Sequence, residues 1–367
     1  MNSSDFMEGE RKHTETAIVH TARYIAIAAV LFVFGCLILL STFFWQGDTA
    51  GPAASVKQAA VANVPVPVST SKPSKPTNVA AELWKAPDEA TIPAGRLGEM
   101  IRYGQDLIAH TSKYFGPNGS IAAISNGMNC QNCHLDGGRK LFGNNYAVFY
   151  SSYPKKGARS GKIDQPADRI ADCFKRSLNG EMPDPGGKEV QAMLAYLKWI
   201  GSGVKKKQKV FGTATEKLKF LDRPADPKRG LVVYNSKCKS CHGADGSGQL
   251  LPDRTGYVYP PLWGPHSYND GAGMTRISNF AGFVKNNMPF GTTYDNPQLS
   301  DEESWDVAAF VNSKPRGHRD SKNDYPDLRV KPIDAPFGPY ADGFSEKQHK
   351  YGPYGPIVAA RKEEKAE

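Results

Sequence analysis

The sequence predicts a mostly helical protein in which two similar units follow an N-terminal membrane-spanning helix. The order of amphipathic helix, Cys-x-x-Cys-His motif, long loop and aromatic-bearing helix occurs twice along the chain. Residues 24–45 contain no charged side chain and are long enough to cross a bilayer. The whole chain of 367 residues is 40% hydrophobic and 23% charged, which is typical of globular rather than disordered proteins.

Positive charges beside the apolar segment predict its orientation. Arg11, Lys12 and Arg23 precede it, and no lysine or arginine follows it before Lys57. Because cytoplasmic flanks are enriched in lysine and arginine, we expect the N-terminus in the cytoplasm and the rest of the chain outside it. A cleaved signal peptide is the alternative interpretation of the same segment.

The two repeated units are bounded by helical patterns. In the first unit, residues 96–111 and 190–200 carry apolar side chains at helical spacing. In the second, residues 229–235 lead directly into the motif, and the closing helix starts at Ser300, where Glu303 completes a capping box.

The expected organisation has seven parts. The tether is rich in Ala, Val, Pro, Ser and Thr, and the C-terminal wrap is rich in Pro, Gly and Tyr, which predicts little regular structure and a fraying end from Arg361 onward. In order, the parts are the cytoplasmic N-terminus (1–23), the transmembrane helix (24–46), the tether (47–81), the first unit (82–204), the linker (205–224), the second unit (225–320) and the wrap (321–367).

The two Cys-x-x-Cys-His motifs predict two covalently bound haem c groups. In such a motif the cysteines form thioethers with the haem and the histidine ligates iron. A redox cysteine pair, half of a zinc site, or disulfides are poorer interpretations, because a histidine follows both pairs at the same offset. The units are therefore predicted to be tandem class I-type cytochrome c domains, attached through Cys130, Cys133 and His134 and through Cys238, Cys241 and His242.

The second haem has a predicted methionine ligand. Met288 lies 46 residues after His242 and is followed by a proline, which suits a rigid loop that presents a thioether. Such a His/Met haem is an electron carrier. Met274 and Lys285 are the other candidates, and core packing is the alternative role of Met288.

The first haem has two candidate ligands, which the residues alone do not separate. Met182 lies 48 residues after His134 and also precedes a proline, as the internal repeat requires. Cys173 is the competitor, since a thiolate is both an iron ligand and a nucleophile. An inert buried thiol is the plainer interpretation of Cys173.

Cys173 falls within a predicted helix with a polar face. Asp164 is expected to cap the start of this helix and Gly180 to end it. Arg169, Cys173 and Ser177 recur every four residues and therefore share one face. A guanidinium beside a thiol favours the thiolate form.

The charge balance predicts an anionic ligand or partner. The net charge is +9, and neither an Arg-rich helix nor an interleaved basic and aromatic pattern points to nucleic acid. We therefore expect an anionic substrate or an acidic partner protein, and no nucleic acid.

Residues 82–357 resemble the dihaem thiosulfate dehydrogenases. The run around Cys173, Arg-Ile-x-Asp-Cys-Phe-x-Arg-Ser-x-Asn-Gly, is the most specific part of this resemblance. Other matching segments are 126–138, which contains the first haem motif, and 143–146, 153–154, 159–161 and 348–353.

The resemblance implies roles for particular residues. In that family the first haem is ligated by histidine and cysteine, and the cysteine sits at the substrate, which favours Cys173 over Met182 as ligand and catalytic residue. Arg159, Arg169 and Ser177 match the substrate-pocket positions. Some relatives carry lysine immediately before the methionine of the second haem, whereas this chain has Asn287.

The implied activity is the oxidation of two thiosulfate ions to tetrathionate, or the reverse, with electrons passed to an external protein such as a cytochrome c. The enzyme is expected at the inner membrane, held by its N-terminal helix, with the catalytic part in the periplasm. The alternative is a non-catalytic, membrane-anchored dihaem electron-transfer cytochrome, in which both haems have His/Met ligands and Cys173 is inert.

Overall fold

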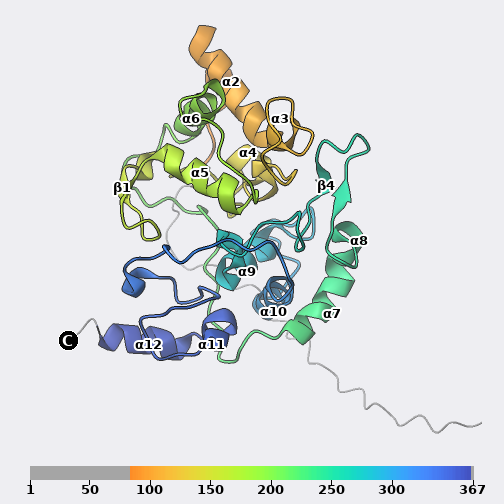
Figure 1. Cartoon of the computed structure of the whole chain (residues 1–367), viewed down its shortest axis with the longest axis vertical. Helices are drawn as coiled ribbons and strands as arrows, with labels where there is room; N and C mark the ends of the chain where they lie inside the picture. Colours follow the sequence, from red (N-terminus) through yellow and green to blue (C-terminus); the bar gives the residue numbers. More distant parts are fainter. Residues whose placement is uncertain (1–82, 365–367) are drawn as a thin grey trace, which may run out of the picture. The chain divides into compact units, whose positions relative to one another are not determined.

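A computed structural model describes residues 83–364, and these residues are mostly helical, as predicted (Figure 1). The α-helices of the first unit are α2 (Gly95–Ala109), α3 (Thr111–Phe115), α4 (Leu135–Gly138), α5 (Pro166–Arg176) and α6 (Lys188–Ile200). Those that follow are α7 (Pro227–Lys237), α8 (Lys239–His242), α9 (Ile277–Asn287), α10 (Asp301–Asn312), α11 (Glu346–Tyr351) and α12 (Gly355–Glu363).

Short 3-10 helices and strands complete the fold. The 3-10 helices are η1 (Glu89–Thr91), η2 (Cys130–Asn132), η3 (Tyr150–Ser152), η4 (Gly273–Thr275) and η5 (Leu328–Val330). Two antiparallel pairs of strands join β1 (Lys155–Lys156) to β2 (Ile163–Asp164) and β3 (Gln249–Leu250) to β4 (Tyr257–Tyr259). Lys155 pairs with Asp164 in the first of these hairpins, which leads into α5.

The predicted N-terminal parts lie outside the described residues. These are the cytoplasmic segment 1–23, the transmembrane helix 24–46 and the tether 47–81. Among residues 83–364, no helix combines the length and the apolar character needed to cross a bilayer.

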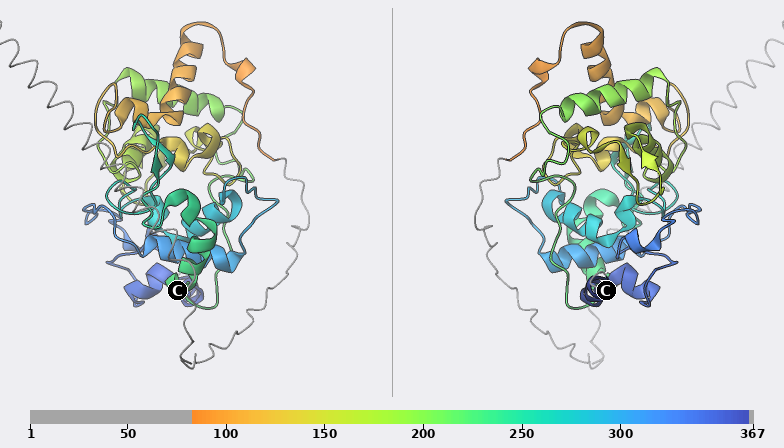
Figure 2. Two further views of the ribbon diagram at one scale, coloured as in Figure 1. Left: turned by 90° about the vertical axis from the view of Figure 1, so that its right-hand side faces the viewer. Right: turned by 90° about the vertical axis from the view of Figure 1, so that its left-hand side faces the viewer.

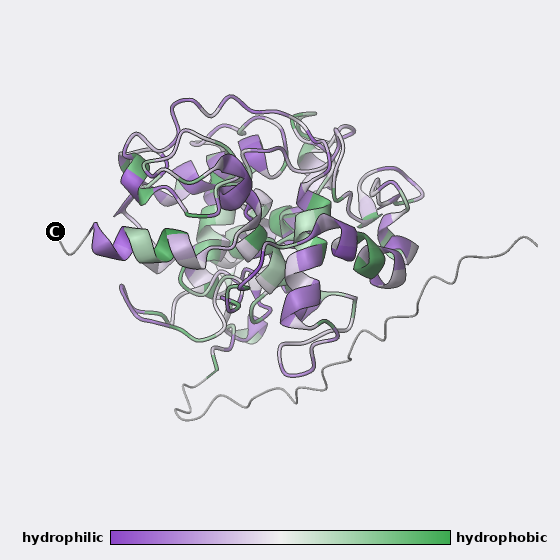
Figure 3. Ribbon diagram, turned by 90° about the horizontal axis from the view of Figure 1, so that it is seen from below, coloured by the Kyte–Doolittle hydropathy of each residue, from purple (hydrophilic) through white to green (hydrophobic). Residues whose placement is uncertain are grey.

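Two hydrophobic clusters organise the helices. One draws its buried residues from positions 92–200 and the other from positions 218–357. In the first, α2 packs against α6; in the second, α10 packs against both α7 and α9 (Figure 2). Hydrophobic residues gather in the interior of the described part and hydrophilic ones on its outer loops (Figure 3).

A glycine lets the opening helix approach the closing helix in each unit. A Cβ on Gly104 of α2 would lie 2.0 Å from the carbonyl oxygen of Ala192 in α6. A Cβ on Gly230 of α7 would lie 1.9 Å from the carbonyl oxygen of Asp306 in α10. Neither position tolerates a side chain unless the backbones move apart.

The N-cap residue predicted from the sequence is the observed one in α10 but not in α5. Ser300 caps α10 and forms the reciprocal box with Glu303, as predicted. The prediction that Asp164 caps α5 is wrong: Gln165 is the N-cap residue and its backbone N–H donates to the Asp168 carboxylate at 2.7 Å. Asp164 instead accepts from the Ser160 hydroxyl at 2.6 Å.

Two further differences concern the ends of elements. Helix α5 stops at Arg176 with Ser177 as its C-cap, about one turn before the predicted end at Gly180. The C-terminal wrap contains α11 and α12, so the expectation of little regular structure is wrong there. Arg361 does not fray, because its guanidinium donates to the Lys331 carbonyl and to Asp342.

Candidate functional site

The first unit encloses a cavity that brings most of the predicted site residues together. Its volume is about 80 Å³. Apolar side chains make up most of its wall, including Tyr146, Phe149, Met193 and Leu197. The chemically reactive or charged lining residues are Cys130, Cys133, His134, Arg169, Cys173 and Ser177.

His134 is held in one orientation and one protonation state. Its Nδ1 lies 2.5 Å from the carbonyl oxygen of Asn144, which only accepts, so Nδ1 carries the proton. Burial lowers the pKa of His134 to about 4, which keeps the ring neutral. Tyr146 stacks on the ring with centroids 4.4 Å apart. His134 therefore keeps an unprotonated Nε2 for a metal.

Helix α5 places Cys173 at this cavity because the neighbouring apolar stripe of the helix, which also lines the cavity, is buried. Ile170 and Phe174 are 7% and 1% exposed, and the ring of Phe174 meets Phe115 edge to face at 5.5 Å. Since residues four apart share one helix face, burying that stripe aligns Arg169, Cys173 and Ser177 with the cavity.

Arg169 keeps its positive charge beside the thiol. The negative charge of a thiolate at Cys173 raises the pKa of Arg169 more than burial lowers it, and Asp172 adds to the same effect. The guanidinium lies 3.5 Å from Asp172, and 42% of the side chain is exposed. It can therefore still form hydrogen bonds to an anion entering the cavity.

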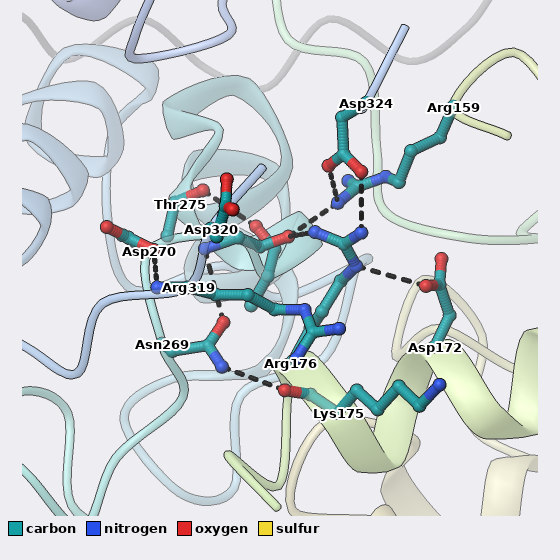
Figure 4. Close-up of polar contacts among 12 residues, drawn as sticks. Arg159, Asp172, Lys175, Arg176, Asn269, Asp270, Thr275, Arg319, Asp320 and Asp324 are labelled. Atoms are coloured by element: carbon teal, nitrogen blue, oxygen red, sulfur yellow. Dashed lines mark hydrogen bonds and ion pairs between the residues drawn. The ribbon is translucent and has the colours of Figure 1, made fainter. Parts of the chain in front are cut away.

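Two predicted candidates lie away from this cavity lining. Met182 is partly buried against the hydrophobic cluster of the first unit. Arg159 donates to the carbonyl oxygen of Gly271 at 2.7 Å and to Asp324 at 3.2 Å (Figure 4). Its guanidinium also lies over the ring of Tyr325.

Sequence reasoning missed Arg176, which lies on α5 beside the site. It is 7% exposed, and its Nε donates to Asp172 at 3.0 Å. Its Nη2 donates to Asp324 at 2.8 Å, and its Nη1 lies 3.4 Å from the carbonyl oxygen of Gly271 (Figure 4). The spacing of four residues from Asp172 was a signal for part of this network.

A second and larger cavity surrounds the second motif, with a volume of about 400 Å³. Cys238, Cys241, His242, Met274 and Met288 all line it. The Nδ1 of His242 lies 2.8 Å from the carbonyl oxygen of Pro260, and burial lowers the pKa of this histidine. Its Nε2 is therefore left for a metal, as in His134.

The other residues named for the second haem have different surroundings. Lys285 is not among the lining residues and instead pairs with Asp301. The Asn287 amide is buried and donates to the carbonyl oxygens of Phe283 at 2.8 Å and Phe142 at 3.2 Å. Asn287 thus joins α9 to the first unit.

The two cavities share part of their walls. Met128, Asn129 and Cys133 line both of them. The first haem motif therefore separates the two cavities and also faces both.

Both cavities fit a covalently attached haem. Each presents two cysteine thiols and an imidazole whose free nitrogen is available in largely apolar surroundings. Burial raises the pKa of Cys130 and Cys133 to about 12 and that of Cys238 to about 11, so these groups are neutral thiols before any attachment.

This chain is similar to a known protein family and to known enzymes. Residues 227–314 match the family model described as cytochrome c. The chain is 36% identical to a thiosulfate dehydrogenase of Thiomonas intermedia over 72% of its own length and 81% of that protein. It is 40% identical to a thiosulfate dehydrogenase of Allochromatium vinosum over 63% and 83%.

A solved structure of a thiosulfate dehydrogenase is also similar to this chain. The thiosulfate dehydrogenase TsdBA of Marichromatium purpuratum, in its as-isolated form, has a TM-score of 0.60 and 33% identity. The match covers 66% of this chain and 51% of that chain, so it spans about half of the solved protein.

Proposed function

The chain belongs to the thiosulfate dehydrogenase family, and we propose that it is an oxidoreductase that joins two thiosulfate ions into tetrathionate, or catalyses the reverse. One observation carries this proposal: Cys173, Arg169 and Ser177 line the same cavity as the first haem motif. In this reaction, two thiosulfate dianions give one tetrathionate dianion and release two electrons.

Two haem c groups are proposed as the cofactors. Bound at the two motifs, haem c supplies one-electron acceptors, the first beside the substrate and the second leading to an external acceptor such as a cytochrome c. Met128, Asn129 and Cys133 line both cavities, which supports a direct contact between the two sites.

The cavity linings support particular iron ligands. Cys173 is proposed together with His134 at the first site, because it lines that cavity and Met182 does not. Met288 is proposed together with His242 at the second site, with Met274 as the alternative that also lines the cavity. Lys285 is the weaker candidate, because its ammonium pairs with Asp301.

Cys173 is the proposed covalent carrier of the thiosulfate sulfur. Its thiolate forms a bond to the outer sulfur of one thiosulfate, and two electrons leave during this oxidation. The outer sulfur of a second thiosulfate then attacks the bound outer sulfur, forms the central bond of tetrathionate and releases the Cys173 thiolate. Dividing the coupling in this way means that the two dianions need not be oxidised together.

The charges around the cavity support an anionic substrate. Arg169 offers forked hydrogen-bond donors to sulfonate oxygens, and the Ser177 hydroxyl can donate a further bond. The predicted contact of Arg159 with substrate is less well supported, since its guanidinium is engaged by Asp324 and Gly271. Arg159 still lies close enough to Asp172 to help lower the pKa of that carboxyl.

We also propose that the enzyme is anchored in the inner membrane by residues 24–46, with its catalytic part in the periplasm. The uncharged run and the flanking arginine and lysine residues support this topology, as does covalent haem attachment outside the cytoplasm. Cell fractionation followed by protease treatment of spheroplasts tests it. Loss of the haem-containing band from intact spheroplasts is expected, and protection of that band contradicts the topology.

The substitution Cys173→Ala tests the catalytic proposal. The variant is expected to keep both covalent haems and to lose thiosulfate-dependent haem reduction. Met182→Leu is the matched control, because it alters the competing ligand candidate outside the cavity lining. Full activity in Cys173→Ala would favour a non-catalytic electron-transfer cytochrome, as would two His/Met signals in low-spin electron paramagnetic resonance of the wild type.

A further inference from the structure

The carboxylate of Asp172 lies between two arginines that have different surroundings. One oxygen accepts a hydrogen bond from Nε of Arg176 at 3.0 Å, and the other lies 3.5 Å from Nη1 of Arg169. Charge-assisted hydrogen bonds are usually about 2.7–2.9 Å long, so the contact with Arg176 is the closer and stronger one. Arg169 lines the Cys173 cavity, whereas Arg176 does not.

Arg176 is fixed by partners from distant parts of the chain. Its Nη2 donates to Asp324 of the C-terminal wrap at 2.8 Å. The carbonyl oxygen of Gly271, from the loop before η4, accepts from Arg159 at 2.7 Å and lies 3.4 Å from Arg176 (Figure 4). Arg159 also donates to Asp324, so the two arginines share both acceptors.

The end of α5 is held by the same loop. The backbone N–H of Asn269 donates to the carbonyl oxygen of Arg176 at 3.0 Å. The side-chain amide of Asn269 donates to the carbonyl oxygen of Lys175 at 2.8 Å and to Asn179 at 3.0 Å. These bonds satisfy carbonyl groups that the helix end leaves unpaired, and they fix the backbone from which Arg176 extends.

The charge of Asp172 creates a conflict beside an anion site. One of its oxygens faces the guanidinium of Arg176 and the other faces that of Arg169, the residue that lines the cavity. An ionised carboxylate at this place competes with any anionic ligand for the guanidinium of Arg169. Competition is weak only while the carboxylate is engaged elsewhere.

We propose that Arg176 and Asp324 are positioning residues: they hold the Asp172 carboxylate beside Arg176 and so keep it from binding the Arg169 guanidinium more closely than 3.5 Å, which leaves hydrogen-bond donors of Arg169 to the anionic substrate. The inference rests on the proposed function, because it concerns the affinity of the same cavity. The segment that supplies Asp324 thereby controls substrate binding without touching the cavity.

Conservative changes separate this role from simple stabilisation. In Arg176→Lys, one ammonium replaces a planar fork and cannot bond both Asp172 and Asp324 in the native geometry. The released carboxylate turns toward Arg169, and the KM for thiosulfate is expected to rise about fivefold to tenfold with little change in kcat. Asp324→Asn is expected to give a smaller rise in the same direction.

The decisive test is the double variant Asp172→Asn/Arg176→Lys. Removing the competing carboxylate is expected to return KM to within about twofold of the wild-type value, although Arg176 is still absent. The single variant Asp172→Asn is expected to lower KM. Asp327→Asn is the matched control, since it breaks the exposed pair with Arg329 in the same C-terminal segment and should leave KM unchanged.

A binding measurement without turnover gives an independent readout. Calorimetric titration of tetrathionate into the oxidised holoprotein should give dissociation constants that follow the same order as KM. Thermal unfolding and the haem spectrum identify any variant that is misfolded, and in that case Asp324→Asn with and without Asp172→Asn replaces the Arg176 pair.

Two results would overturn the inference: a double variant no better than Arg176→Lys, or a rise in KM on Asp172→Asn alone. Either would mean that Asp172 orients Arg169 or that Arg176 only stabilises the fold. A wild-type protein that neither binds tetrathionate nor oxidises thiosulfate would overturn the proposed function itself, which distinguishes the two failures.

Discussion

Gly104 and Ala192 bring α2 and α6 into backbone contact, because a Cβ on Gly104 would stand 2.0 Å from the Ala192 carbonyl oxygen. The substitution Gly104→Ala is therefore expected to force the helices apart and destabilise the fold by about 1–3 kcal/mol, the usual effect of overpacking. Thermal unfolding followed by circular dichroism measures this change.

Gly203→Ala is the control for that substitution. No atom lies within 4 Å of a Cβ at Gly203, so the variant should unfold at the wild-type temperature. Gly230→Ala, at the equivalent crossing of α7 and α10, is expected to resemble Gly104→Ala. A fully stable Gly104→Ala protein would contradict the close approach of the two helices.

Tyr146 is expected to support the orientation of His134 through its ring rather than its hydroxyl. The stacked ring lies 4.4 Å from the imidazole, and burial raises the pKa of the phenol well above its ordinary value. Tyr146→Phe should retain the wild-type spectrum of the first haem. Tyr146→Leu should broaden that spectrum and lose about 0.5–1.5 kcal/mol of stability. Equal spectra for the two variants would show that the stacking has no such role.

Arg169 is expected to affect substrate affinity by contact rather than by overall charge. Arg169→Ala should raise the KM for thiosulfate about tenfold to a hundredfold, as expected for a lost charge-assisted hydrogen bond. Lys175→Ala removes the same charge from an exposed position of α5 and should change KM by less than about twofold. Steady-state kinetics at fixed ionic strength compares the two. Similar effects of both variants would indicate that long-range electrostatic attraction, rather than contact with Arg169, sets the KM.

Asp342 is expected to contribute stability that disappears in acid. Burial alone would raise its pKa, but hydrogen bonds from His349 and Arg361 outweigh burial and hold the pKa below its ordinary value. A carboxyl whose pKa is lower in the folded state stabilises the fold above its unfolded pKa of about 3.9. That contribution is lost as pH falls through the lower folded pKa.

The variant Asp342→Asn isolates this effect. Because only 4% of the Asp342 side chain is exposed, this substitution should lower the free energy of unfolding by about 3–5 kcal/mol at pH 7. The difference in unfolding temperature between wild type and variant should shrink as the pH falls below about 4 and through the lower folded pKa of Asp342. Asp222→Asn, at an exposed carboxyl, should follow the wild type at every pH. A constant difference for Asp342→Asn across this range would exclude the proposed pKa shift.

The sequence predicted those features that depend on neighbours in the chain. The capping box of Ser300 and Glu303 and the amphipathic patterns of α2, α6 and α7 follow from local spacing. The cap of α5 was misassigned because the Asp164 carboxylate accepts a hydrogen bond from Ser160 instead, which leaves Gln165 as the N-cap residue. Helices α11 and α12 were missed because proline and glycine dominate the composition of the wrap.

Long-range contacts explain what the sequence could not give. Arg159 and Arg176 meet Asp324 across more than a hundred residues of chain, so neither spacing nor composition reveals that pair. The approach of Cys173 to the first motif likewise depends on how α5 packs on Phe115. Family resemblance, rather than spacing, favoured Cys173 over Met182.

The cap that Asn269 places on α5 has a consequence for the ancestry of the chain. Although each half contains a Cys-x-x-Cys-His motif between an opening and a closing helix, the helix that carries Cys173 is completed by a residue from the other half and by Asp324 beyond it. Exchanging one half for that of another cytochrome would therefore leave the last carbonyl groups of α5 without the hydrogen bonds from Asn269. After any duplication that produced such a chain, the two copies became mutually dependent, and they are expected to have diverged as one heritable unit.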